Sequence, residues 1–368
     1  MAIPESEARR LVIEAGHRLQ AEGLIARTWG NISARISDTQ FVITPSGLAY
    51  DTLREDQLVV VNIADCSYMG DIKPSSEKGI HADSYRCRPE VDFIIHTHQF
   101  YASCVGLTGK ALALAPHPLL GSYVPCAAYG MPSTKKLRQA VEAAVAEYAE
   151  SKAVFLLRHG ALCMGSSAEE AFAVAQALET VCKAAYDAAV APQKVQPADA
   201  LGDSRREEDR FLLTIDGEEK SYPVELAEEA PAAAKLHAAI YRATEARCIL
   251  HAAEENTVLV SACSKTLRPR IDDLAQIAGI TVRCAKYEPS AVVKALRKRD
   301  AVLVQGQGAL CIGVDRDDAE AVAMILEKCC AAERYASVVP NCRPLSRLDA
   351  YIQRQFYLMK YSKRKAEG

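Results

Sequence analysis

Several features that would place the chain in a special class of protein are scarce or missing. The 368 residues include one tryptophan and only 6% aromatic residues, and the net charge is −3, which offers no general electrostatic footprint for nucleic acid. No apolar run approaches the ~18 residues of a membrane span. The opening segment MAIPESEARR carries acidic residues where a signal peptide needs basic and then apolar ones. We therefore expect a cytoplasmic protein that binds neither nucleic acid nor membranes.

Cysteine is not scarce, but its pattern lacks any C-x-x-C pair among 13 residues. Because the number is odd and the spacing scattered, the sequence predicts neither a disulfide framework nor a cysteine zinc site. Buried reduced thiols are the expected state. The adjacent Cys329 and Cys330 fall in a helical pattern and are expected to pack in a core.

The length predicts about two domains, and a comparison of the chain with itself indicates that they are copies. The segment AVFLLRHGALCMG at 153–165 returns as AVLVQGQGALCIG at 301–313. HADSYRC at 81–87 likewise returns as HAAIYRA at 237–243, and the order of the segments is kept. This regularity is typical of a tandem repeat of one folded unit.

A stretch rich in proline, alanine and charged residues lies between the copies and is typical of a surface linker. The sequence predicts four parts: a catalytic domain over 1–195, a linker over 196–209, a degenerate domain without metal ligands over 210–345, and a C-terminal helix with a basic tail over 346–368. The second copy would then lack a counterpart to most of residues 20–75.

Hydrophobic periodicity predicts a mixed α/β fold for the first copy. We expect helices over about 5–23, 78–87, 134–150 and 168–189, and strands at FVIT, LVVVN, DFIIHTH and AVFLL. A domain with a sheet at its centre follows from this alternation.

Three histidines of the first copy are candidates for a metal site. His96 and His98 stand two apart on an apolar strand, so their side chains project from the same face, and His159 ends the strand AVFLLRH. Three imidazoles leave a position open on zinc for a substrate, as in catalytic sites. An isolated H-x-H is more often two unrelated histidines, and it is the neighbouring motifs that favour the metal.

Three short segments have backbone amides and hydroxyls that suit an anion. They are TWGNIS at 28–33, TPSG at 44–47 and KPSSE at 73–77. Taken singly, 73–77 is about equally well explained as a helix cap, and each of the other two segments is more often just an ordinary turn.

Taken together and in order, TWGNIS, ITPSG, PSSE, HTH and RHG resemble the class II aldolase/adducin family. The resemblance covers about 5–190, with a weaker echo over about 225–338. It implies a three-layer α/β/α fold with a mainly antiparallel central sheet, and Zn²⁺ or another divalent ion on His96, His98 and His159. It also implies that the phosphate of a small phosphorylated sugar is held by seven residues: Thr28, Gly30, Asn31, Ser46, Gly47, Ser75 and Ser76.

The residue after the paired serines divides the chemistries of the family that the chain resembles. Aldolases carry glutamate there and epimerases aspartate, and this chain has Glu77. The resemblance therefore implies an aldehyde-lyase of sugar catabolism that cleaves a ketose 1-phosphate to dihydroxyacetone phosphate and an aldehyde, with Glu77 shuttling the proton. Tyr123 and Tyr129 are the phenols available to act on the aldehyde oxygen, with simple packing as the alternative for both.

Two alternative functions stay open at this point. A pentose-phosphate 4-epimerase or a phosphorylated sugar-acid decarboxylase would use the same metal and phosphate site. An adducin-like interaction protein is the non-catalytic alternative, and the complete set of Glu77 and three histidines argues against it for the first copy.

The second copy keeps the pattern of the fold without the chemical groups. Three of its positions lack the functional residue of the first copy: Gln307 stands for His159, Ala253 for His98 and Ala233 for Glu77. Only His251 survives, as the counterpart of His96, and we expect no catalytic metal there. The resemblance also implies a homo-oligomer with active sites near domain or subunit interfaces.

Overall fold

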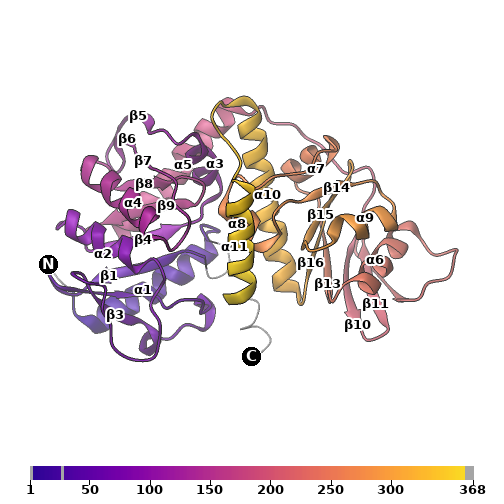
Figure 1. Cartoon of the computed structure of the whole chain (residues 1–368), viewed down its shortest axis with the longest axis horizontal. Coiled ribbons are helices and arrows are strands. Elements are labelled where there is room, and N and C mark those ends of the chain that lie inside the picture. The colour runs from indigo at the N-terminus through magenta and orange to yellow at the C-terminus, as the bar shows by residue number, and fades with distance from the viewer. Residues whose placement is uncertain (1–2, 26–28, 361–368) are drawn as a thin grey trace. The chain divides into compact units, whose positions relative to one another are not determined.

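The computed structural model describes residues 3–25 and 29–360, and the chain divides into two compact units (Figure 1). The first comprises the residues up to Ala189 together with Val339–Cys342, and the second comprises the remainder. No helix in the described ranges is long and apolar enough to cross a lipid bilayer.

A seven-stranded sheet forms the centre of the first unit, in the order β3-β2-β1-β4-β9-β8-β7. Its strands are β1 (Asn31–Arg35), β2 (Gln40–Ile43), β3 (Val59–Asn62), β4 (Phe93–Thr97), β7 (Cys126–Ala127), β8 (Ala153–Leu156) and β9 (Gly160–Gly165). Every neighbouring pair is antiparallel except β7 with β8. The hairpin of β5 (Leu112–His117) and β6 (Gly121–Val124) forms a separate small sheet.

Helices cover both faces of this sheet and complete the three layers. One face carries α1 (Glu5–Ala21), α3 (Phe100–Val105) and α5 (Ala168–Ala189), and the other carries α2 (Lys78–Cys87) and α4 (Lys135–Glu147). Short 3₁₀ turns lie at Tyr50–Thr52, Glu55–Gln57 and Gly106–Thr108. Because both faces are covered, the central strands β1, β4 and β9 are buried along their whole length.

The second unit repeats this design strand for strand, in the order β12-β11-β10-β13-β16-β15-β14. Its strands are β10 (Asp203–Glu207), β11 (Arg210–Ile215), β12 (Glu218–Pro223), β13 (Cys248–Ala252), β14 (Arg283–Ala285), β15 (Ala301–Val304) and β16 (Gly308–Gly313). Again one edge pair, β14 with β15, is parallel. The duplicated three-layer fold with a mainly antiparallel sheet is thus confirmed.

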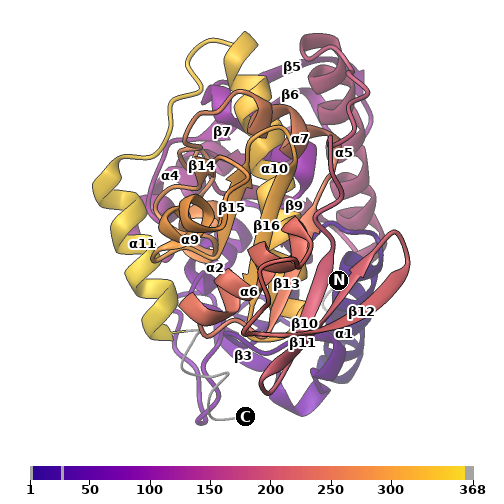
Figure 2. The ribbon, with the colours of Figure 1, turned by 90° about the vertical axis from the view of Figure 1, so that its right-hand side faces the viewer.

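Helices flank the second sheet in the same way (Figure 2). One face carries α6 (Ala232–Ala243) and α9 (Pro289–Leu296), and the other carries α7 (Glu255–Ala262) and α10 (Arg316–Val338). Next to α10 lies α8 (Asp272–Ile277), on which α11 (Arg347–Lys360) packs. Cys329 and Cys330 are buried on α10, as expected of packing residues.

The expected division of the chain needs one correction. The predicted linker over 196–209 contains β10, which pairs with β11 and β13 inside the second sheet. The second sheet therefore begins before residue 210, and β10, β11 and β12 are the counterparts of β1, β2 and β3 that the sequence comparison did not find. Charged side chains on β10 and the exposed side chains of the edge strand β12 give these strands no apolar run to recognise.

Candidate active site

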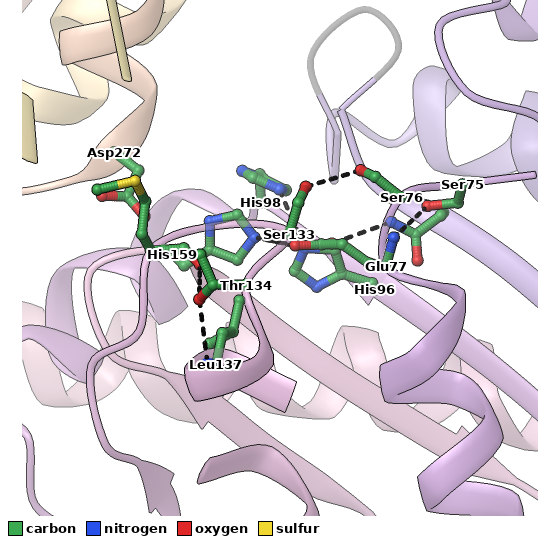
Figure 3. Close-up of polar contacts among 12 residues, drawn as sticks. Ser75, Ser76, Glu77, His96, His98, Ser133, Thr134, Leu137, His159 and Asp272 are labelled. Carbon is green, nitrogen blue, oxygen red and sulfur yellow. Dashed lines mark hydrogen bonds and ion pairs between the residues drawn. The ribbon is translucent and has the colours of Figure 1, made fainter. Parts of the chain in front are cut away.

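Three histidine side chains of the first unit point toward one another (Figure 3). His96 lies on β4, His98 directly follows it, and His159 lies in the turn that leads into β9, the neighbour of β4. His96 Nε2 lies 3.1 Å from His98 Nε2 and 3.2 Å from His159 Nε2, and all three side chains are buried. No other group of three His, Cys, Asp or Glu side chains in the described ranges is arranged to hold a metal ion.

The chemistry of this nitrogen set fits a divalent ion. His96 Nδ1 donates to the carbonyl oxygen of Ala161 at 2.9 Å, and since a carbonyl only accepts, His96 Nε2 keeps its lone pair for the cluster. Burial lowers the pKa of His96 to about 3, so the ring is neutral at neutral pH. Nitrogen ligands of a tetrahedral zinc lie about 3.3 Å apart, close to the separations found here.

Two glycines allow the backbone to close around His96. Gly30 has a φ of +100°, and a Cβ there would lie 2.6 Å from the carbonyl oxygen of His96. A Cβ on Gly160 would overlap the carbonyl oxygen of Thr97 and lie 3.2 Å from the His96 ring. The glycines of the TWGN and RHG motifs are therefore required by close approach.

Glu77, directly before α2, places its carboxylate against the histidines. Oε1 lies 3.2 Å from His159 Nε2, and Oε2 lies 3.4 Å from His96 Nε2. Burial raises the pKa of Glu77, but the neighbouring His159, His96 and His98 lower it by a larger amount, so the pKa lies well below its ordinary value. The site thus holds an ionised, buried carboxylate beside a nitrogen cluster.

The two turns expected to bind phosphate lie side by side. Ser46 N donates to the Lys73 carbonyl at 2.9 Å, and Ser75 N donates to the Thr44 carbonyl at 3.0 Å. Gly47, with a φ of +78°, lies in the first of these turns. Segments some thirty residues apart in the sequence thereby form one polar surface.

The paired serines connect this surface to Glu77 and to α4. Ser75 Oγ accepts a hydrogen bond from the backbone N–H of Glu77 at 3.2 Å. Ser76 Oγ accepts one from Ser133 Oγ at 2.8 Å, and Ser133 has a left-handed φ of +64° just before α4 (Figure 3). A pocket of about 510 Å³ opens here between α2 and the start of α4. Its wall contains Lys78 and Lys135 as well as the acidic Glu142.

The remaining predicted phosphate residues are placed differently. Asn31, the first residue of β1, is buried, and its Nδ2 donates to Glu77 Oε2 at 3.2 Å. Asn31 thus borders the site, as expected, and also donates a hydrogen bond to the Glu77 carboxylate. The sequence did not indicate this second contact. Gly30 precedes Asn31, and Thr28 lies outside the described residues.

The two candidate tyrosines lie in different surroundings. The Tyr129 ring is stacked under the guanidinium of Arg158, 5.1 Å from the ring centroid, and Arg158 directly precedes His159. Tyr123 is 54% exposed on β6, in the separate hairpin. The structure thus brings Tyr129 to the turn that carries His159.

Sequence reasoning missed several residues around the cluster. Trp29 lies against His98, with ring centroids 6.0 Å apart, and Arg158 adopts a left-handed φ of +67° beside His159. His81 donates from Nε2 to Asn31 Oδ1 and so reaches the site indirectly. One signal was available for His81, because HADSY returns as HAAIY in the second copy.

In the second unit, the counterpart of His96 is His251, and backbone groups of the same unit bind both nitrogens of its ring. His251 Nε2 donates to the carbonyl oxygen of Gln307 at 2.6 Å, and His251 Nδ1 accepts from the backbone N–H of Leu201 at 3.2 Å. Both ring nitrogens are thus engaged in hydrogen bonds within the unit, which leaves no lone pair for a metal.

Comparisons with known proteins identify the family of the chain. The family described as "Class II Aldolase and Adducin N-terminal domain" matches residues 10–186 and again residues 195–333. A 5-deoxy-D-ribulose 1-phosphate aldolase of Bacillus thuringiensis serovar kurstaki is 30% identical over 197 residues, which are 52% of this chain and 91% of the relative.

Solved structures of similar proteins cover about half of the chain. An L-fuculose 1-phosphate aldolase is 32% identical, with a TM-score of 0.45, over 49% of this chain and 84% of its own. An L-fuculose-1-phosphate aldolase from Thermus thermophilus is 26% identical, with a TM-score of 0.42, over 49% of this chain and 93% of its own.

Proposed function

The chain belongs to the class II aldolase and adducin family, and from this premise we propose that its first unit is a metal-dependent aldehyde-lyase. It would cleave a ketose 1-phosphate to dihydroxyacetone phosphate and an aldehyde. The observation that carries the proposal is the place of Glu77, whose buried carboxylate lies 3.2–3.4 Å from two histidines of the cluster and next to the turn of Ser75 and Ser76. The aldolase names of the similar proteins support it.

Each part of the substrate has a proposed partner. His96, His98 and His159 would hold a divalent ion, proposed to be Zn²⁺, which when bound polarises the substrate carbonyl and stabilises the electron pair left by carbon–carbon cleavage. The phosphate would be held by Ser46, Gly47, Ser75 and Ser76 of the two neighbouring turns, together with Gly30 and Asn31 at the start of β1. Thr28, which lies outside the described residues, is proposed to join them.

Cleavage requires the transfer of one proton within the substrate. The hydroxyl at C4 loses its proton as the aldehyde forms, the electrons of the C3–C4 bond return to C3, and C3 takes up a proton. Glu77 is proposed to carry that proton, because its carboxylate is ionised and borders the cluster. In the reverse direction a phenol would donate to the aldehyde oxygen, and Tyr129 is better placed for this than Tyr123.

The first test is release of dihydroxyacetone phosphate from fuculose, rhamnulose, ribulose and 5-deoxyribulose 1-phosphates, with zinc present and after chelation. Release that chelation abolishes and zinc restores is expected, and the relative rates would identify the aldehyde. No release from any of them, with metal still bound, would instead favour an epimerase or a decarboxylase.

Substitution of Glu77 separates catalysis from metal binding. Glu77→Gln should reduce turnover by at least about 10²-fold, because the amide keeps the shape but cannot take up the proton, and zinc should remain bound. His159→Gln should lose both activity and zinc. Full activity of Glu77→Gln would contradict the assignment of the proton carrier.

We further propose that the protein acts in the cytoplasm as a homo-oligomer, with active sites near domain or subunit interfaces. The exposure of Tyr123 on its hairpin is compatible with a contact to another subunit. Sedimentation velocity at micromolar concentration tests the oligomer, and a monomer with full activity would exclude it.

A further inference from the structure

A chain of buried hydrogen bonds leads from the core of the first unit to Glu77. Tyr85 Oη lies 2.7 Å from Ser33 Oγ, and Ser33 Oγ lies 2.6 Å from His81 Nδ1. His81 Nε2 lies 2.5 Å from Asn31 Oδ1, and Asn31 Nδ2 lies 3.2 Å from Glu77 Oε2. All five side chains are buried, so no water competes for these bonds.

The amide of Asn31 determines the direction of the bonds in this series, because its nitrogen only donates and its oxygen only accepts. Asn31 Nδ2 donates to Glu77 Oε2, and Asn31 Oδ1 faces His81 Nε2. His81 Nε2 must then carry the hydrogen, and because burial lowers the pKa of His81 to about 4, its Nδ1 is a bare acceptor. Ser33 donates to that nitrogen, and Tyr85 donates to Ser33.

The Asn31 amide also shows that this series of hydrogen bonds cannot conduct protons. A side-chain amide does not exchange a proton between its oxygen and its nitrogen on the time scale of a turnover, so the chain is no path for protons. Its effect is orientation, because the donor on His81 stops the Asn31 amide from turning its oxygen toward the Glu77 carboxylate.

The second unit provides an internal comparison. Ser204 Oγ lies 2.6 Å from both His237 Nδ1 and Tyr241 Oη, which repeats the serine, histidine and tyrosine of the first unit. There the His237 Nε2 hydrogen goes to the backbone carbonyl of Leu201 at 3.1 Å, and no acid follows. The trio thus belongs to the fold of both units, and only the first unit extends it to a carboxylate.

We propose that His81 is a positioning residue for the reaction, acting on Glu77 through Asn31. The bond from Asn31 holds Oε2 as an acceptor and leaves Oε1, which faces His159 at 3.2 Å, as the oxygen that meets the substrate. This inference rests on the proposed function, in which Glu77 carries the proton.

Three variants of the full chain test the inference. His81→Leu removes the donor to Asn31 and should lower kcat by about 10–100-fold, with KM and zinc content little changed. His81→Gln supplies an amide donor at the same reach and should restore most of kcat. His237→Leu removes the matching donor in the second unit and should lose comparable stability with kcat unchanged.

The outcomes separate the two levels of the proposal. If His81→Leu keeps the kcat of the wild type, or if His237→Leu lowers kcat as much, the positioning role is wrong. If the wild type cleaves no ketose phosphate, the proposed function fails instead. The hydrogen assignment is then still tested by ¹⁵N NMR of the wild type, with the His81 signals identified by their loss in His81→Gln. An Nε2–H tautomer at pH 7 is expected, and an Nδ1–H tautomer or an imidazolium would overturn the inference.

Discussion

At the scale of single residues, Gly160 determines how closely two strands approach at the histidine cluster. A side chain there would overlap the Thr97 carbonyl and press on the His96 ring, and Gly308 of the second unit stands against Ala252 in the same way. In both units the nearest atom is a backbone carbonyl oxygen, which cannot move aside as a flexible side chain could. A side chain at either glycine would therefore require the backbone to shift.

We predict that Gly160→Ala lowers the free energy of unfolding by about 1–3 kcal/mol and weakens zinc binding, because β9 carries His159 away from His96. Urea unfolding and zinc titration measure the two effects. Gly308→Ala is the control in the second unit. It should lower stability at least as much, because Gly308 also has a φ of +95° that alanine rarely adopts, while zinc affinity stays at the wild-type level. Unchanged zinc affinity in Gly160→Ala would show that the cluster tolerates the shift.

Buried His237 makes stability depend on pH. Burial lowers the pKa of His237 to about 3, opposed by its bond to the Leu201 carbonyl and assisted by repulsion from His251. Below the ordinary value of about 6.5 the unfolded chain binds a proton that the folded chain does not take up until about pH 3. Stability from this residue is therefore fully present above pH 6.5 and is lost as the pH falls toward 3.

His237→Gln should flatten that dependence. We expect the melting temperature of the wild type to fall more steeply between pH 7 and pH 5 than that of the variant, as measured by calorimetry with the metal removed. Parallel curves for the two proteins would show that His237 is protonated in the folded state, contrary to its burial.

At the scale of elements, a buried ion pair holds α2, and with it Glu77, against α4. The Asp83 side chain is only 1% exposed and accepts from Arg138 Nη2 at 2.7 Å, with Arg86 as a second partner. Arg138 is 36% exposed and can be hydrated when Asp83 is removed, whereas Asp83 stays buried when Arg138 is removed.

Arg138→Met should therefore be the more damaging of the two substitutions, by about 1–3 kcal/mol of unfolding free energy, and Asp83→Asn should cost less. Urea unfolding of both variants gives the comparison. An equal loss would mean that Arg86 alone satisfies the Asp83 carboxylate.

Elements with strong periodicity were predictable from the sequence. The helix predicted over 78–87 is α2, and the helix predicted over 168–189 is α5. His96 and His98 were expected on one side because residues two apart on extended backbone share a face, and His98 keeps that side although β4 ends at Thr97. Their meeting with His159 and Glu77 depends on strand pairing between distant segments, which only the family resemblance indicated.

The strand β1 and the hairpin of β11 and β12 were not predicted, because polar and charged residues hid their sequence patterns. The segment 28–33 was expected as a turn, yet β1 begins inside it at Asn31, because Ser33 and Asn31 are buried polar residues satisfied by His81. The hairpin of β11 and β12 turns at Asp216 and Gly217, both with positive φ, and this Asp-Gly pair is a hairpin signal that the charged surroundings concealed.

At the scale of the whole molecule, one fold occurs twice and only one copy carries the groups for chemistry. The family matches both halves, whereas the similar 5-deoxy-D-ribulose 1-phosphate aldolase matches only 52% of the chain. In the second unit, Gln307 stands at the position of His159 and is itself tied to Asp199 by two hydrogen bonds. A core of the same design persists without the metal ligands because packing, not the cluster, supplies most of its stability.

The metal content of the full chain tests this asymmetry. We predict one equivalent of zinc per chain after dialysis against metal-free buffer, measured by plasma mass spectrometry. His159→Gln, which installs the residue of the second unit, should bind none. Gln307→His should still bind only one, because both nitrogens of His251 are engaged within the unit and Ala253 offers no ligand. Two equivalents in the wild type, or zinc retained by His159→Gln, would place a metal outside the histidine cluster and contradict the assignment of one site to one unit.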